Sequence, residues 1–151
     1  MNILIFVCSF LLMELVAWSA HKYIMHGFLW RLHKDHHTKE NSDQVMEHND
    51  FFFVIFATPG IICIVLGSFF DVPYTLAIGS GISVYGLCYF LVHDIFIHQR
   101  IKLFSKSNNA YFRAIRRAHK KHHKHLTKEH GECFGMLLVP FKYFRNELAK
   151  K

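Results

Sequence analysis

Histidine stands out in this sequence, both in number and in spacing. The chain has 13 histidines among its 151 residues. Ten of them form two patterns, H-x4-H and H-x2-H-H, and this pair of patterns occurs twice. The ten positions are His21, His26, His33, His36, His37, His93, His98, His119, His122 and His123. Imidazole suits iron, zinc, copper and nickel, so the spacing predicts metal binding and leaves the metal open.

The two patterns place different demands on a helix. Residues three and four apart share one helical face, so each H-x2-H-H motif projects its imidazoles together. H-x4-H is less regular, because five residues turn about 140° around an ideal α-helix. That spacing predicts either ligands for two different metals or a loosened helix end, which Gly27, just after His26, would permit. Ten nitrogen ligands exceed the needs of one metal, so two metals are implied.

Three apolar stretches must position these motifs. They cover residues 2–20, 51–70 and 74–92, and each has about the 20 residues that a helix needs to cross a hydrocarbon core of roughly 30 Å. Hydrophobic residues make up 52% of the chain and include 16 Phe. We therefore predict an all-α integral membrane helical bundle with about three to four spans, built as a single domain over residues 1–151.

Charge predicts the topology of these spans. All 18 Lys and Arg residues lie in residues 22–39 or from Arg100 onward. Under the positive-inside rule both segments face the cytoplasm, and the Asp71-Val72-Pro73 link faces away. Both histidine-rich segments then form a cytoplasmic di-metal cap. Attraction to anionic lipid headgroups explains the net charge of +7 better than nucleic acid does, and the same charge could dock an acidic electron donor.

Three carboxylates lie where they could assist a metal site. Glu14 falls within the first predicted span, near the helical face of His21. It is either a ligand, a base behind the ligands or polar lining, or it makes an interhelical hydrogen bond. Asp35 and Asp94 lie inside histidine motifs, where a carboxylate could accept the second ring N–H of a ligand. A solvated Asp35 fits the sequence equally well.

Other polar residues near the motifs have simpler expected roles. Asn49 or Asp50 is expected to cap the second apolar helix, and His48 is left unassigned. His125 and His130 break the spacing and are expected at the surface.

Two structural expectations concern helix packing and helix ends. The glycines of the third stretch, Gly79, Gly81 and Gly86, should permit close helix approach. Residues 105–109 should cap a helix that begins at Ala110 and carries the last histidine cluster.

The order HxxxxH, HxxHH, HxxxxH, HxxHH resembles the fatty acid hydroxylase superfamily of membrane di-iron enzymes. More narrowly, residues 21–27 with Trp30, and the tail from His119 to Gly135, resemble the bacterial β-carotene 3-hydroxylases. The resemblance covers nearly all of residues 14–144.

The resemblance implies a non-haem di-iron monooxygenase of carotenoid biosynthesis. It would hydroxylate the β-ionone ring at C3, converting β-carotene through β-cryptoxanthin to zeaxanthin. The cofactor would be two iron ions held by the ten motif histidines, with O2 as co-substrate. Electrons would come from a reductase system, commonly ferredoxin. The expected location is the bacterial inner membrane, with the carotenoid entering from the bilayer and the active site on the cytoplasmic face.

Two alternatives remain open on the sequence. The first is a related membrane oxygenase acting on a sterol, a fatty acyl chain or another carotenoid. The second is a membrane metal carrier or sensor without catalysis. A carrier needs a polar path through the membrane, and Glu14 is the only carboxylate within the predicted spans.

Overall fold

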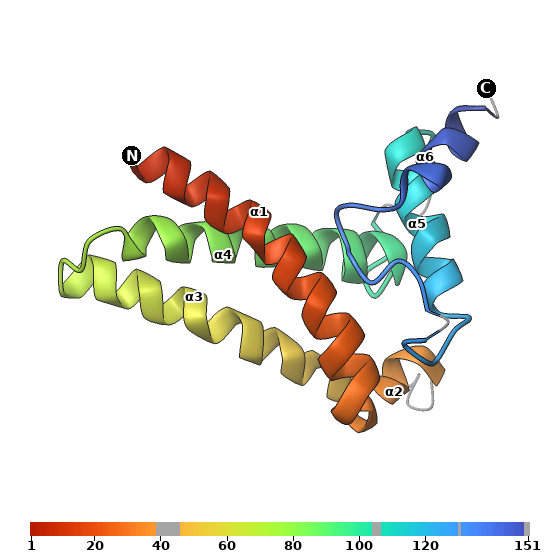
Figure 1. The fold of residues 1–151 in the computed structure, drawn as a ribbon, viewed down its shortest axis with the longest axis horizontal. Helices are drawn as coiled ribbons and strands as arrows, with labels where there is room; N and C mark the ends of the chain where they lie inside the picture. The colour runs from red at the N-terminus through yellow and green to blue at the C-terminus, as the bar shows by residue number, and fades with distance from the viewer. Residues whose placement is uncertain (39–45, 104–106, 130, 150–151) are drawn as a thin grey trace. The chain divides into compact units, whose positions relative to one another are not determined.

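The computed structural model describes residues 1–38, 46–103, 107–129 and 131–149 (Figure 1). These residues form helices and no strands, which confirms the all-α prediction. The chain divides into two compact units. Unit 1 comprises Met1–Val16 and Arg31–Cys88, and unit 2 comprises Ala17–Trp30 and Tyr89–Lys151.

Three helical segments in the described part of the chain are long and apolar enough to cross a membrane. They are Asn2–Phe28, His48–Phe69 and Thr75–Ile97. Each covers one predicted apolar stretch to within one residue and extends beyond it at one end. The longest segment, Asn2–Phe28, continues through His21 and His26. The first H-x4-H motif therefore lies within the same helical segment as the first apolar stretch.

Unit 1 contains the apolar helices. Its elements are most of α1 (Asn2–Ala20) and α2 (Trp30–Thr38), a 3₁₀ turn η2 (His48–Asp50), α3 (Phe51–Phe69) and most of α4 (Thr75–Phe90). Helices α3 and α4 run side by side and are joined by a tight turn (Figure 1). Asp71 and Tyr74 in this turn have φ values of 50° and 65°, the left-handed region that most residues avoid. The Asp71-Val72-Pro73 link is therefore a tight turn.

Glycines bring the helices of unit 1 together. A Cβ added at Gly79 would lie 2.7 Å from the carbonyl oxygen of Gly60 on α3, and one at Gly81 would lie 2.7 Å from the carbonyl oxygen of Phe6 on α1. Only glycine allows such close backbone approach, so the prediction is confirmed at these two positions. At Gly86 it is wrong, because an added Cβ meets no atom of the described residues within 4 Å.

Unit 2 contains two π-helical turns, η1 (His21–Phe28) and η3 (Leu91–Ile97), and helices α5 (Ala110–His122) and α6 (Phe141–Leu148). Helix α5 begins as predicted, because the side chain of Asn109 accepts the N–H of Tyr111 at 2.9 Å. The small residues Ala114 and Ala118 on α5 are fully buried and pack in one cluster with Tyr143 of α6.

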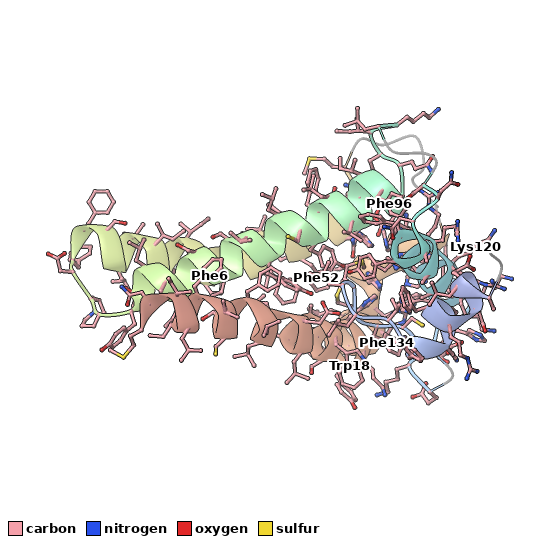
Figure 2. All side chains as sticks on the ribbon, turned by 90° about the horizontal axis from the view of Figure 1, so that it is seen from above. Phe6, Trp18, Phe52, Phe96, Lys120 and Phe134 are labelled. Atoms are coloured by element: carbon pink, nitrogen blue, oxygen red, sulfur yellow. The ribbon has the colours of Figure 1, made fainter. Side chains whose placement is uncertain are left out.

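The two kinds of helix differ in side-chain chemistry. Side chains along α1, α3 and α4 are almost all carbon, whereas nitrogen atoms gather along α5 and α6, where Lys120 is labelled (Figure 2). This is the segregation of apolar and basic residues predicted from the sequence.

Candidate metal centre

Both H-x4-H motifs lie where an α-helix loosens into a π-helix. Helix α1 continues as η1 and α4 continues as η3. A π-helix joins residues five apart, and the N–H of His98 donates to the carbonyl of His93 at 2.9 Å. The ring centroids of His93 and His98 are 4.5 Å apart, and those of His21 and His26 are 5.1 Å apart. The loosened helix is thus the alternative that the structure adopts.

Glycine accounts for only one of the two loosened turns. Gly27 in η1 leaves the helical region, with φ −110° and ψ −123°. The π-helical turn η3 has the sequence LVHDIFI and contains no glycine. The five-residue spacing of the histidines is the feature that the two turns share.

Three histidines converge in unit 2. One ring nitrogen each from His21, His26 and His122 lies within 4.8 Å of the other two. All three side chains are buried. The Nε2 atoms of His26 and His122 are 3.2 Å apart.

Backbone carbonyls orient these three rings. The Nδ1 atoms of His21, His26 and His122 lie 2.9, 3.0 and 3.1 Å from the carbonyl oxygens of Phe134, Leu126 and Glu132, respectively. A carbonyl oxygen only accepts hydrogen bonds, so each Nδ1 carries a proton and donates it. In a neutral imidazole the Nε2 atom then holds a lone pair.

This donor set fits a metal ion. Two lone pairs face each other between His26 and His122, an arrangement that requires a cation. Burial, followed by the neighbouring His26, lowers the pKa of His122 to about 3, which favours the neutral ring. Neutral imidazoles are the form that binds transition metals. A nitrogen separation of about 3 Å suits neighbouring ligands of one ion, given metal–nitrogen bonds of about 2.1 Å.

A second convergence in unit 2 involves His93, His98 and His119, which also offer ring nitrogens within 4.8 Å of one another. The Nε2 atom of His119 lies 2.9 Å from that of His98 and 2.8 Å from that of His123. Burial and then the neighbouring His93 hold the pKa of His119 well below its usual value. In this group too, ring nitrogens of different histidines face each other.

Asp94 supports the second convergence. Its Oδ2 atom lies 3.2 Å from the Nδ1 atom of His93 and accepts that N–H. Its other carboxylate oxygen, Oδ1, lies 3.3 Å from the Nε atom of Arg100. Asp94 therefore accepts a ring N–H of a motif histidine, which is the role expected for it.

The H-x2-H-H motif of unit 1 lies on α2. His33, His36 and His37 are all buried, and the Nε2 atoms of His33 and His37 are 3.1 Å apart. The Nδ1 atom of His33 donates to Oδ1 of Asn49 at 2.6 Å, and that of His36 donates to Oε2 of Glu47 at 2.9 Å. Because Nδ1 donates in both rings, Nε2 is the atom that His33 and His36 can offer to a metal.

Two of the three carboxylates considered above make other contacts. Asp35 accepts the backbone N–H of His36 at 2.9 Å and both the backbone N–H and the ring of His48. Glu14 accepts the hydroxyl of Tyr85 at 2.6 Å, which is the interhelical hydrogen bond between α1 and α4.

The prediction that Asn49 or Asp50 caps the second apolar helix is wrong. The carboxylate of Asp50 accepts the backbone N–H of Glu47 at 3.0 Å and so caps the 3₁₀ turn η2. It does not cap α3, which has no side-chain cap at Asp50. Asn49 binds His33 instead of capping. His125 is partly exposed, and His130 lies outside the described residues.

Sequence reasoning missed the groups that orient the rings. Glu47 was not considered, although it lies next to His48 and is one of few carboxylates near the motifs. The carbonyls of Leu126, Glu132 and Phe134 have no signature in the sequence, because every residue carries one.

The fold and the site define a class: a helical membrane protein whose clusters of buried histidines fit a metal centre. The chain belongs to the fatty acid hydroxylase family, whose model matches residues 6–142. As a member of a hydroxylase family it is an oxidoreductase, and its histidine clusters fit a metal-dependent oxygenase.

Individual relatives are similar over most of the chain. The β-carotene hydroxylase of Paracoccus sp. (strain PC1) is 40% identical over 138 residues, covering 91% of this chain and 83% of that protein. The β-carotene hydroxylase of Pantoea ananas is 40% identical over 139 residues, covering 92% of this chain and 78% of that protein. The chloroplastic β-carotene hydroxylase 2 of Capsicum annuum is 35% identical over 131 residues, covering 85% of this chain and 41% of that protein. No solved structure matches the chain significantly.

Proposed function

We propose that the chain is a β-carotene 3-hydroxylase, which inserts one oxygen atom from O2 at C3 of the β-ionone ring. The products would be β-cryptoxanthin after one hydroxylation and zeaxanthin after two. The observation that carries this proposal is the 40% identity to the β-carotene hydroxylase of Paracoccus sp. (strain PC1), which extends over 91% of the chain.

We propose two iron ions as the cofactor. The two separate convergences in unit 2, around His122 and around His119, support a count of two. Repetition of the H-x2-H-H motif supports adding His33, His36, His37 and His123 to the ligands. When bound, iron supplies the oxidant that attack on an unactivated C–H bond requires, since no amino-acid side chain does so.

The chain's own residues orient the ligands and exclude water. Hydrogen bonds at Nδ1 fix the tautomer and direction of each ring, which keeps Nε2 available. Burial of His21, His26 and His122 keeps water from the reacting centre and so limits side reactions. The apolar surface of the spans lets a carotenoid approach through the bilayer.

The electron donor is proposed to be an acidic protein, ferredoxin with its reductase. Exposed cationic side chains lie on α5 and α6 and just beyond α5, which supports docking of such a donor. They are Arg117, Lys120, Lys121, Lys124, Lys142 and Arg145. By the positive-inside rule these residues are cytoplasmic, so the proposed location is the inner membrane with the active site on its cytoplasmic face.

Pigment chromatography tests this function. Bacterial cells engineered to accumulate β-carotene would receive the wild-type gene, His122→Ala, or His125→Ala as a matched control outside the motifs. Zeaxanthin or β-cryptoxanthin should appear with the wild type and His125→Ala, and not with His122→Ala.

Unchanged β-carotene in the presence of membrane-inserted, iron-loaded wild-type protein would contradict the proposal. It would favour a sterol or fatty acyl substrate. A purified protein that binds two metals and consumes no O2 with any reductant would favour a metal carrier.

A further inference from the structure

A short polar segment, residues 47–50, lies against the buried histidines of α2. Glu47 and Asn49 each accept a ring N–H, from His36 at 2.9 Å and from His33 at 2.6 Å. The His36 side chain is 1% exposed and the Glu47 side chain 26% exposed. The carboxylate thus bridges a buried imidazole and the solvent.

The 47–50 segment is fastened to α2 at its backbone as well. Oδ2 of Asp35 accepts the N–H of His48 at 2.6 Å, and Oδ1 accepts the N–H of His36 at 2.9 Å. Within the segment, Oδ2 of Asp50 accepts the N–H of Glu47 at 3.0 Å. These bonds fix the backbone from which Glu47 and Asn49 reach the two rings.

The two acceptors have similar geometry and different charge. An amide oxygen such as that of Asn49 orients a ring without changing the net charge near it. A carboxylate such as that of Glu47 also draws the shared proton toward itself, which makes the opposite ring nitrogen a stronger donor to a metal. The rings of His33 and His36 are therefore not equivalent as metal ligands, although both belong to the same H-x2-H-H motif.

We propose that Asn49 and Glu47 are positioning residues for the α2 histidines, and that the charge of Glu47 makes His36 the stronger metal ligand. The proposal rests on the proposed function in one respect, that metal binds these histidines. A structural role alone would make Glu47 a link between α2 and the start of α3. Glu47→Gln separates the two, because it keeps an acceptor oxygen and removes the charge.

Iron titration of the metal-stripped full chain in detergent, under anaerobic conditions, tests the proposal. The variants are Glu47→Gln, Glu47→Ala and Asn49→Asp, with Glu129→Gln as a control at an exposed carboxylate. Loss of an outer partner of a metal ligand typically costs about 10–100-fold in metal affinity. We expect about a tenfold loss for Glu47→Gln, a larger loss for Glu47→Ala, and wild-type affinity for the control.

A charge exchange sharpens the test. In Glu47→Gln/Asn49→Asp the carboxylate moves from His36 to His33, and the double variant should recover part of the affinity lost in Glu47→Gln. The thermal unfolding of the metal-free Glu47→Gln protein should match that of the wild type.

Wild-type affinity in Glu47→Gln would overturn the proposed role of the charge. A loss of affinity in Glu47→Gln accompanied by equal destabilisation of the metal-free protein would overturn it in favour of a structural link. If the wild type binds two irons and every variant matches it, this inference fails and the proposed function stands. If the wild type binds no iron, the proposed function itself fails.

Discussion

The two H-x2-H-H motifs have the same spacing and different support. On α2, in unit 1, the rings of His33 and His36 donate to the side chains of Asn49 and Glu47. On α5, in unit 2, the ring of His122 donates to the backbone carbonyl of Glu132. Motif spacing therefore determines which rings share a helical face. The surrounding structure determines which acceptor each ring N–H donates to.

This difference has a practical meaning for variation. A side-chain acceptor can be exchanged by one substitution, so the electronic character of the α2 rings is adjustable. A backbone acceptor persists under substitution and is lost only when its loop moves. The carbonyl that accepts from His122 belongs to Glu132, which follows α5. The Glu132 side chain holds this residue in place, because it accepts the hydroxyl of Tyr143 at 2.8 Å and also binds Lys142.

The largest effect is expected from removing a ligand from either motif. His36→Ala and His119→Ala should each abolish turnover and reduce bound iron while leaving membrane insertion intact, because both rings are buried in the proposed site. Product chromatography, metal analysis and membrane fractionation measure the three properties. If one variant kept full activity, the two motifs would not be equivalent in function, and the ligand assignment there would be wrong.

A smaller effect is expected from the ion pairs that join α5 to α6. The buried Glu147 lies 3.2 Å from Arg113 and 2.8 Å from Arg117. Glu147→Gln leaves two cations without their counter-charge, which costs about 3–5 kcal/mol when the pair is fully buried. Because both arginines are partly exposed, we expect a loss of about 2 kcal/mol in the free energy of unfolding. Denaturant unfolding in detergent measures this loss. An unchanged midpoint would show that the ion pairs of Glu147 do not stabilise the packing of α5 on α6.

A smaller loss of stability is expected from removing the hydrogen bond between Tyr143 and Glu132. Tyr143→Phe removes one hydrogen bond to Glu132 and leaves the contact with Lys142, so we expect about 1 kcal/mol lower stability. Since the carbonyl of Glu132 orients His122, iron affinity should fall too, although the variant is remote from the ligands. A change in stability without any change in affinity would separate the loop from the metal centre.

The smallest effect is expected at His48. Its side chain is 65% exposed, and Asp35 still accepts the backbone N–H of residue 48 in His48→Ala. We expect a change within about 0.5 kcal/mol in the free energy of unfolding and wild-type iron affinity. A large loss in either measurement would mean that the ring, and not the backbone, holds the 47–50 segment.

The parts of the molecule that follow from periodicity were predictable. Continuous apolar runs predict α1, α3 and α4, and the three- and four-residue spacing predicts a shared face for His33, His36 and His37. The capped start of α5 followed from the polar residues before Ala110. In each case the information lies within a few residues of the element concerned.

The parts that depend on distant contacts were not predictable. Glu47 meets His36 across an 11-residue separation, and Phe134 meets His21 across 113 residues. Neither contact follows from local spacing. Asn49 is a second example. Its residue type suits a helix cap, but the fold places the ring of His33 beside it, and it accepts that ring's N–H instead. The close approach expected at Gly86 is not found, because no atom of the described residues lies within 4 Å of a Cβ placed there.

The π-helical turns have a consequence for how such a motif can change by insertion or deletion. Deleting one residue between His21 and His26 would give H-x3-H, which an ordinary α-helix already presents on one face. Each π-helical turn therefore absorbs one extra residue without parting its histidines. In an unbroken α-helix the same extra residue would rotate all the following residues by about 100°. The wider turn takes up that rotation, so the rest of the span keeps its orientation toward lipid while the histidine pair stays together.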